Sequence, residues 1–245
     1  MSRKSDPAGA TRSSRPGHRD PVSATRSARG RLRQGRERSS RSVTAAGVGA
    51  LEAAPDSLRE RARALGADRK ARWAGKTSGQ IEGVQETRRL YRAIGIDPTR
   101  HRPSSEALCR RILKDKGFPE VNSVVDEINL ASLETLLSYG LYDLDKIVGP
   151  VVVRKGRSGE SYAGIRKGEI TIEGRFCLAD DEGPFGNPSS DSLRTCTSPA
   201  TRALLLVVFV PHDAGAERVH EGLDAACRNL SETGSPQLGA RVLLP

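Results

Sequence analysis

Apolar residues recur every three to four positions in the sequence between Asp56 and Gly117, a spacing typical of amphipathic helices. The pattern predicts a helix that Asp56 caps and that runs to about Trp73. It predicts a second helix over residues 80–94 and a third that begins at Ser104 or Ser105 and ends at Gly117. A fourth helix is predicted within residues 121–137, entered from a short strand or turn.

The hydrophobic period changes to that of strands after Tyr139–Asp145. Short apolar segments separated by glycine turns predict a meander over residues 151–153, 160–165, 169–172 and 175–178. The run 203–210 is apolar throughout, which predicts a central strand covered on both faces. A last helix over 214–230 and an edge strand over 240–244 complete the pattern. The predicted class is α+β, with a mixed or antiparallel central sheet and flanking helices.

Residues 183–195 stand out because they combine two glycines, two prolines, four hydroxyl groups, a carboxylate and a guanidinium. Proline removes a backbone donor and glycine is costly to order, so we expect neither a regular helix nor a central strand here. A polar loop beside the buried strand 203–210 is typical of a small-molecule pocket. A surface connection made of turn residues is the alternative.

Asn122, Asp126 and Asn129 are spaced four and three residues apart, so they share one face of the predicted helix. Polar groups beside an apolar set need partners when they are buried, which marks this face as a candidate site. The alternative is a polar edge that faces solvent.

The net charge of +10 is concentrated at the N-terminus. Residues 1–50 hold 12 lysines and arginines against 3 acidic residues, whereas the rest of the chain holds 28 against 27. Because residues 1–50 contain hardly any large apolar side chain, we expect a disordered Arg/Ser-rich tail. Such a tail is either dispensable to the folded core, an arm that contacts RNA phosphates, or a segment similar to an organelle transit peptide, although it lacks the apolar face of one. Residues 51–79 are expected to form an N-terminal helical extension, followed by the main domain over 80–245.

The four cysteines, residues 109, 177, 196 and 227, show no zinc-ligand spacing and no disulfide framework. The longest apolar run is the eight residues 203–210, too short to cross a bilayer. The chain also lacks nucleotide-binding glycine motifs and the HExxH metal motif. We therefore expect a cytoplasmic protein with reduced thiols, no metal, no cofactor and no membrane partner.

Several motifs, in order, resemble the B3/B4 domain of the phenylalanyl-tRNA synthetase β subunit and of standalone proteins. They are Val121–Asn129, Tyr142-Asp143, Gly149–Arg154, Gly159-Glu160 and Gly183–Gly186. The string Gly183–Thr195 is especially similar to the standalone branch. The resemblance covers roughly residues 85–230. It implies an editing domain that hydrolyses the ester of a wrongly attached amino acid on tRNA.

The resemblance also implies site residues. Asn129 matches a pocket asparagine, Asp126 an aspartate three residues before it, and Gly183 and Gly186 the glycines whose backbone approaches the substrate. The sequence departs from the synthetase at Gly140, where the family has a pocket histidine, and near Val207, where it has a tyrosine-recognising glutamate. The remaining substrate-binding candidates are Asn122, Glu160, Asp191, Ser192, Arg194 and Thr195. The catalytic candidates are Asn129, Asp191 and Ser192.

With tyrosine specificity in doubt, other groups must select the substrate side chain. Asp191, Glu127, Asp126 and Glu160 are candidates, and two of them facing the pocket would suit a cationic side chain. The resemblance to standalone relatives implies arginine analogues such as canavanine on arginine tRNA as a substrate class for a trans-editing deacylase. The alternative is a non-catalytic module that binds tRNA or a free amino acid. The sequence leaves open which amino acid and which tRNA are involved.

Overall fold

The computed structural model describes residues 42–47, 51–232 and 237–242. Its helices are α2 (Asp56–Arg72), α3 (Glu82–Ala93), α4 (Ser104–Leu113), α5 (Ser123–Thr135) and α6 (Ala216–Glu232), with 3-10 turns at Ser78–Gln80 and Leu144–Lys146. Its strands are β1 (Ser42–Gly47), β2 (Ser138–Asp143), β3 (Val152–Lys155), β4 (Ser161–Ala163), β5 (Glu169–Thr171), β6 (Phe176–Asp180), β7 (Gly183–Asn187), β8 (Ser190–Asp191), β9 (Ala203–Phe209) and β10 (Gln237–Val242).

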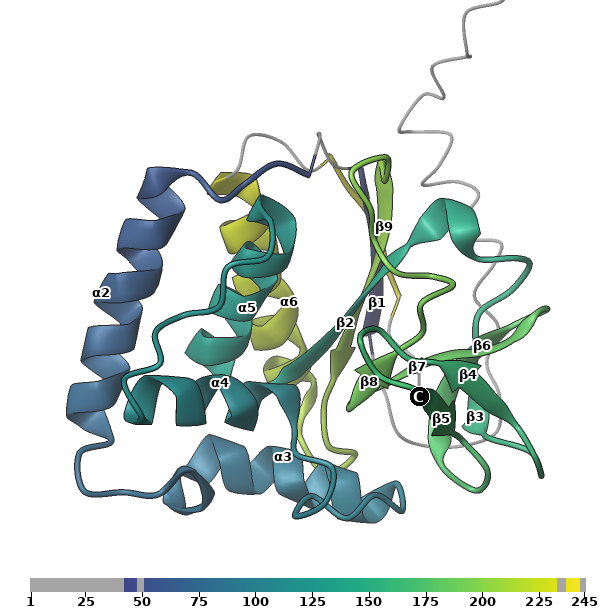
Figure 1. Cartoon of the computed structure of the whole chain (residues 1–245), viewed down its shortest axis with the longest axis horizontal. Helices are drawn as coiled ribbons and strands as arrows, with labels where there is room; N and C mark the ends of the chain where they lie inside the picture. The colour runs from purple at the N-terminus through teal and green to yellow at the C-terminus, as the bar shows by residue number, and fades with distance from the viewer. Residues whose placement is uncertain (1–41, 48–50, 233–236, 243–245) are drawn as a thin grey trace, which may run out of the picture.

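Strand β9 lies inside the main sheet, whose order is β10-β1-β9-β2 and whose pairings are all antiparallel. Every residue of β9 is buried because both faces are covered. Leu204 and Leu206 pack against α5 and α6, whereas Leu205 and Val207 pack against side chains of the second sheet. Figure 1 shows the helices on one side of the main sheet and strands β3–β8 on the other. The predicted central strand and the α+β class are confirmed.

The second sheet has the order β3-β6-β7-β8, and β4 and β5 form a separate hairpin beside it. Here the sequence-based expectation for residues 183–195 is wrong, because β7 is an interior strand. Pro184 is tolerated since it pairs only with Ala179 of β6, whereas β8 reaches no further along β7 than Gly186. A register shift between Leu178 and Ala179 accompanies the proline. A single stretch therefore supplies both a strand and a turn.

The helical half forms where the apolar spacing predicts it, with shifts at the ends. Asp56 is the first residue of α2 rather than its N-cap, a position that Pro55 occupies. Helix α5 is capped by Asn122, whose Oδ1 accepts a hydrogen bond 2.9 Å from Val125 N. It ends at Thr135, two residues before the predicted limit. The next residue, Leu136, has a left-handed φ of 60° and turns the chain into β2.

The boundary expected for the N-terminal tail needs correction. Residues 42–47 form β1, which is hydrogen-bonded between β9 and β10. The expectation of disorder for residues 1–41 and 48–50 lies outside the described residues. Helix α2, expected as an extension, packs through Leu58 and Ala62 against Leu130 of α5. The predicted edge strand is β10, which begins three residues earlier than expected.

Candidate functional site

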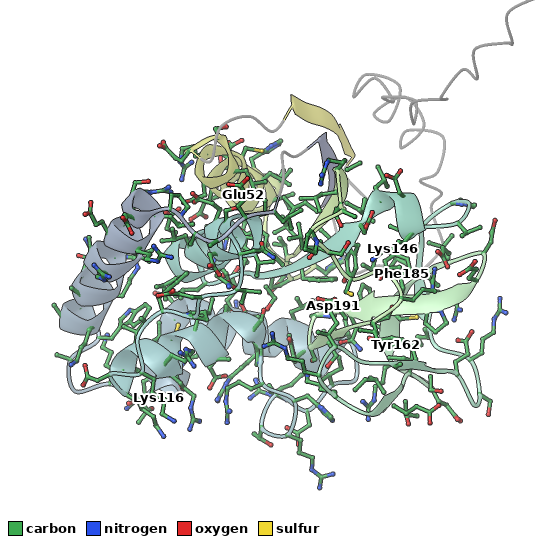
Figure 2. The ribbon with its side chains drawn as sticks, turned by 45° about the horizontal axis from the view of Figure 1, so that its top comes forward. Glu52, Lys116, Lys146, Tyr162, Phe185 and Asp191 are labelled. Atoms are coloured by element: carbon green, nitrogen blue, oxygen red, sulfur yellow. The ribbon has the colours of Figure 1, made fainter. Side chains whose placement is uncertain are left out.

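A cavity of about 180 Å³ opens where the two halves of the molecule meet. Strand β2, the first residue of α4, the turn between β4 and β5, and the β7–β8 turn surround it. The residues that line it are Ser104, Tyr139, Ile165, Lys167, Asn187, Pro188, Ser189, Ser190 and Asp191. Figure 2 shows Asp191 at this junction, between the helical half and the strands that carry Tyr162 and Phe185.

The β7–β8 turn takes its shape from Asn187. The side-chain Oδ1 of this buried asparagine accepts hydrogen bonds from Ser189 N, at 2.8 Å, and Ser190 N, at 3.0 Å. This is the local hydrogen-bonding for which asparagine is favoured in turns. The Asn-Pro-Ser-Ser sequence thus folds into a tight turn and places Asp191 directly after it.

Two tyrosines from other elements fix this turn from both sides. The hydroxyl of Tyr91, on α3, donates a hydrogen bond to the carbonyl of Pro188. The hydroxyl of Tyr162, on β4, donates to the carbonyl of Ser190 at 2.5 Å. The turn is therefore held by side chains of both halves, so its position beside the cavity is set before any ligand binds.

Asp191 is the acidic residue among those that line the cavity. Its Oδ1 accepts a hydrogen bond 2.6 Å long from the hydroxyl of Tyr142, a residue of β2. Burial raises the pKa of Asp191 to about 7, although the Tyr142 hydrogen bond and the charge of Lys167 oppose the shift. A carboxyl group that titrates near neutral pH can accept and return a proton under physiological conditions.

Tyr142 is fully buried, and its position depends on two glycines. A Cβ atom added at Gly140 would lie 2.7 Å from its Cε2, and one added at Gly186 would lie 2.7 Å from its Cε1. The ring also contacts Phe185 edge to face, with centroids 5.0 Å apart. Because larger residues at either glycine would collide with the ring, these glycines allow Tyr142 to reach Asp191.

Lys167 supplies the cationic group among the cavity-lining residues. Its Nζ donates to Ser190 Oγ at 2.8 Å and to Ser189 O at 3.3 Å. An ammonium group has three N–H donors, so one donor remains for a ligand. The cavity therefore presents one carboxyl, one ammonium and several hydroxyl groups around a small volume.

The three polar residues that follow Asp191 belong to the framework rather than to the cavity lining. Ser192 and Thr195 are buried, and their hydroxyl oxygens lie 3.4 Å apart. Arg194 donates two hydrogen bonds to Asp180, at 2.8 and 3.0 Å, and stacks over Phe185 at 5.9 Å. Gly183 has a φ of 119° and pairs with Asp180, outside the cavity lining.

The polar face of α5 lies away from the cavity lining. Asn122 caps the helix, and Asp126 accepts hydrogen bonds from Val121 N at 3.1 Å. Burial raises the pKa of Asp126 to about 6, and Asn129 lies within hydrogen-bonding reach of this carboxyl. The start of α5 is bonded to Glu52, which Figure 2 shows apart from Asp191.

The two remaining carboxylates suggested by the sequence are engaged by arginines. Glu127 accepts two hydrogen bonds from Arg61, at 2.9 and 3.0 Å. Glu160 accepts two from Arg154, at 2.6 and 2.7 Å. Neither lines the cavity. Of the four carboxylates that the sequence suggests for substrate selection, only Asp191 is among the residues that line it.

Sequence reasoning missed the residues that surround Asp191. In the sequence Tyr142 stands out only as part of a family motif, although its alternation with Gly140 along a strand places both on one face. Asn187 lies within residues 183–195, where the sequence marks it only as a turn residue. No sequence pattern identifies Lys167, Tyr91 or Tyr162, because only the tertiary structure brings them close to Asp191.

The described residues contain no group of three or more His, Cys, Asp or Glu side chains placed to hold a metal ion. None of the helices in that part of the chain is both long enough and apolar enough to cross a membrane.

The fold and the cavity define an α+β domain with a small polar pocket beside its main sheet. Residues 86–232, more than half of the chain, match the family model of the B3/4 domain. The chain therefore belongs to the B3/4 domain family, which confirms the resemblance drawn from the motifs.

Two relatives are phenylalanine–tRNA ligase β subunits. Those of Bifidobacterium longum and Clostridium tetani are each 30% identical, over 111 and 109 residues respectively, or 44% of this chain. The matches span only 12% and 14% of those subunits. Among solved structures, an N-terminal fragment of the Pyrococcus horikoshii phenylalanyl-tRNA synthetase β subunit is similar, with a TM-score of 0.41 and 20% identity. That match covers 52% of this chain and 47% of the fragment.

Proposed function

We propose that the cavity hydrolyses the ester between an amino acid and the 3′ end of a tRNA, acting in trans on mischarged molecules. The observation that carries the proposal is the carboxyl of Asp191, which titrates near pH 7 in a cavity that also holds Lys167. The relation to tRNA ligase subunits supports an aminoacyl-tRNA substrate.

The proposed chemistry needs one base and one stabilised oxyanion. Ionised Asp191 takes a proton from water as the water oxygen attacks the ester carbonyl carbon. The remaining donor of Lys167 faces the negative charge that develops on the carbonyl oxygen. The bond from the carbonyl carbon to the ribose oxygen then breaks, and Asp191 returns its proton to that oxygen. The products are a free amino acid and an uncharged tRNA.

The size of the cavity fits the aminoacyl end of this substrate. Pockets that enclose drug-sized ligands measure about 300–1,000 Å³, so about 180 Å³ suits an amino acid with the nucleotides left outside. Ser192 is an unsuitable nucleophile, because its hydroxyl is buried beside Thr195 with no base in contact. Asn129 remains a candidate from the family resemblance, outside the cavity lining.

The proposal extends to the side chain of the amino acid that the cavity accepts. A cationic side chain, as in canavanine on arginine tRNA, would meet one carboxyl group in the cavity rather than the two suggested by the sequence. We therefore propose a panel of mischarged tRNAs that includes canavanyl-tRNA and tyrosyl-tRNA. Activity on tyrosyl-tRNA alone would contradict a cationic specificity.

Asp191→Asn tests the catalytic role. Removing a general base is expected to lower the rate of amino-acid release by about 10²–10⁴-fold. Asp213→Asn, at an exposed aspartate, is the matched control and should retain wild-type turnover. Equal rates for the two variants would remove Asp191 from the mechanism. A wild-type protein that binds tRNA or a free amino acid without releasing any product would instead support a non-catalytic binding module.

A second experiment addresses the basic N-terminal segment, which we propose as an RNA-contacting arm. Deletion of residues 1–41 removes 12 basic side chains and leaves β1 in place. We expect weaker tRNA binding and a flatter dependence of the logarithm of affinity on the logarithm of salt concentration. Affinity that is unchanged at low salt would leave this segment without a role in RNA binding.

A further inference from the structure

Basic side chains from three segments gather beside the mouth of the cavity. Arg100 and His101 lie in the connection between α3 and α4, and both are exposed. Lys167, in the turn between β4 and β5, lines the cavity itself, as does Ser104, three residues after His101. Arg175 lies in the connection between β5 and β6. We call Arg100, His101, Lys167 and Arg175 the basic rim.

Two observations place these segments together. The carbonyl oxygen of Gly174 lies 4.0 Å from the position that a Cβ atom at Gly95 would take, so the connections that carry Arg100 and Arg175 are adjacent. His101 lies within electrostatic reach of Arg175, Lys167 and Arg100. Partial loss of hydration and these three cations hold the pKa of His101 below its ordinary value.

The positive charge of the basic rim is poorly compensated within the described residues. No carboxylate in residues 51–232 lies within ion-pair distance of Lys167 or Arg175. Arg100 is 84% exposed and lies 3.8 Å from Asp97, whose carboxylate already accepts two hydrogen bonds from Thr99.

Two basic residues of α2 differ from those of the rim. Lys70 is paired with Asp115 at 2.5 Å, and Arg72 with Asp68 at 2.8 Å. Positive charge without a close carboxylate partner therefore lies beside the cavity, where an anionic ligand would enter.

We infer that the basic rim binds the phosphates of the RNA strand whose 3′ end enters the cavity. The inference rests on the proposed function and names the surface that would hold the rest of the substrate. An aminoacyl ester at a 3′ terminus is preceded by phosphodiesters, and a cavity sized for an amino acid leaves them outside. Arginine guanidinium groups suit this task because they bind phosphate oxygens through two parallel hydrogen bonds.

The test compares two double variants of the full chain that lose equal charge. Arg100→Gln/Arg175→Gln alters the rim, and Arg63→Gln/Lys116→Gln is the control, at exposed positions. Figure 2 shows Lys116 far from Asp191 and Tyr162. Thermal midpoints of both variants that equal the midpoint of the wild type would show that both fold as the wild type does.

The first readout is the affinity for a labelled RNA hairpin with a single-stranded 3′ end and no amino acid. At about 0.1 M salt the rim variant should bind roughly tenfold more weakly. Its slope of log affinity against log salt should be smaller by about 1.4, or about 0.7 for each lost phosphate contact. The control should stay within about twofold of the wild type. Equal losses in both variants, or no loss in either, would overturn the inference.

The second readout separates the rim from the chemistry. A 3′-aminoacyl adenosine carries the ester but no phosphate, so the rim variant should hydrolyse it as the wild type does, whereas the KM for aminoacyl-RNA should rise. If the wild type hydrolyses neither ester but hairpin binding depends on the rim, the proposed function is wrong and the proposed phosphate binding by the rim is retained. If the wild type hydrolyses both esters and the KM for aminoacyl-RNA is unchanged in the rim variant, only the proposal for the rim is wrong.

Discussion

Two carboxylates in this molecule, one fully buried and one half-buried, have opposite surroundings. Glu106, in the helical half, has a fully buried side chain that receives two hydrogen bonds from Arg88, both at 2.7 Å, and one from Ser78 at 2.9 Å. Asp191, at the junction of the two halves, receives a hydrogen bond from the neutral hydroxyl of Tyr142, and no cation lies within ion-pair distance among the described residues.

The two carboxyl groups shift in opposite directions as a result. Burial alone would raise the pKa of Glu106, but the hydrogen bonds from Arg88 and Ser78 outweigh it and the pKa is lowered. At Asp191 burial prevails and the pKa rises to about 7. A compensated carboxylate contributes to structure, whereas an uncompensated one retains a proton that it can exchange. The comparison indicates which of the two is available for chemistry.

The largest expected effect on stability comes from breaking the compensated pair. Arg88→Ala would leave Glu106 buried without its main partner and should lower the free energy of unfolding by about 3 kcal/mol. Urea denaturation measures this loss. Arg72→Ala, at an exposed ion pair with Asp68, is the control and should cost less than about 1 kcal/mol. Similar losses in the two variants would mean that Glu106 does not depend on Arg88.

A smaller, pH-dependent effect is expected at Asp191. Because its pKa is about 7 when folded and about 3.9 when unfolded, the folded state binds more protons between these values. Asp191 therefore makes the wild type less stable as pH rises through this window. Asp191→Asn removes the effect, so the stability difference between variant and wild type should shift in favour of the variant by about 2 kcal/mol from pH 4.5 to pH 8, allowing for partial solvent exposure.

Urea melts of both proteins across this pH range measure the difference. Asp126, whose pKa is also raised, titrates in both proteins and cancels in the comparison. A difference that is constant with pH would mean that Asp191 titrates as an ordinary exposed aspartate.

The smallest expected effect comes from a substitution that tests the role of the Tyr142 hydroxyl. Tyr142→Phe removes the hydrogen bond that favours ionised Asp191, so the pKa of Asp191 should rise further. The acidic limb of the kcat/KM profile for ester hydrolysis should move to higher pH by about one unit. The free energy of unfolding should fall by about 1 kcal/mol. A variant that loses stability while its pH profile stays in place would limit Tyr142 to packing.

The sequence predicts those features that depend on local pattern. The central strand β9 follows from its unbroken apolar run, and the helices follow from their apolar spacing. The family resemblance points to the stretch that contains Asp191. The contact between Tyr142 and Asp191 could not be predicted, because it joins residues 49 positions apart through the meeting of two sheets.

Strands β7 and β1 are among those that the sequence pattern does not predict, and they share a reason. Strand β7 contains glycine and proline, which are poor strand formers, and it forms because β6 offers a partner edge. Strand β1 follows an Arg/Ser-rich segment and contains one large apolar residue, Val43. It pairs with β9 and β10, which lie far along the chain, so no local sequence pattern predicts this strand.

The placement of β1 has a consequence for how the protein is made. Its six residues insert between two strands that are synthesised last, so the main sheet cannot be completed until residue 242 has left the ribosome. Pairing across such a long stretch of chain slows folding and leaves an edge of β9 open in the meantime. A fragment cut at residues 86 and 232, the limits of the family match, would keep that edge open permanently. Such a fragment should self-associate through unpaired backbone groups, and restoring residues 42–47 and 237–242 should suppress the association.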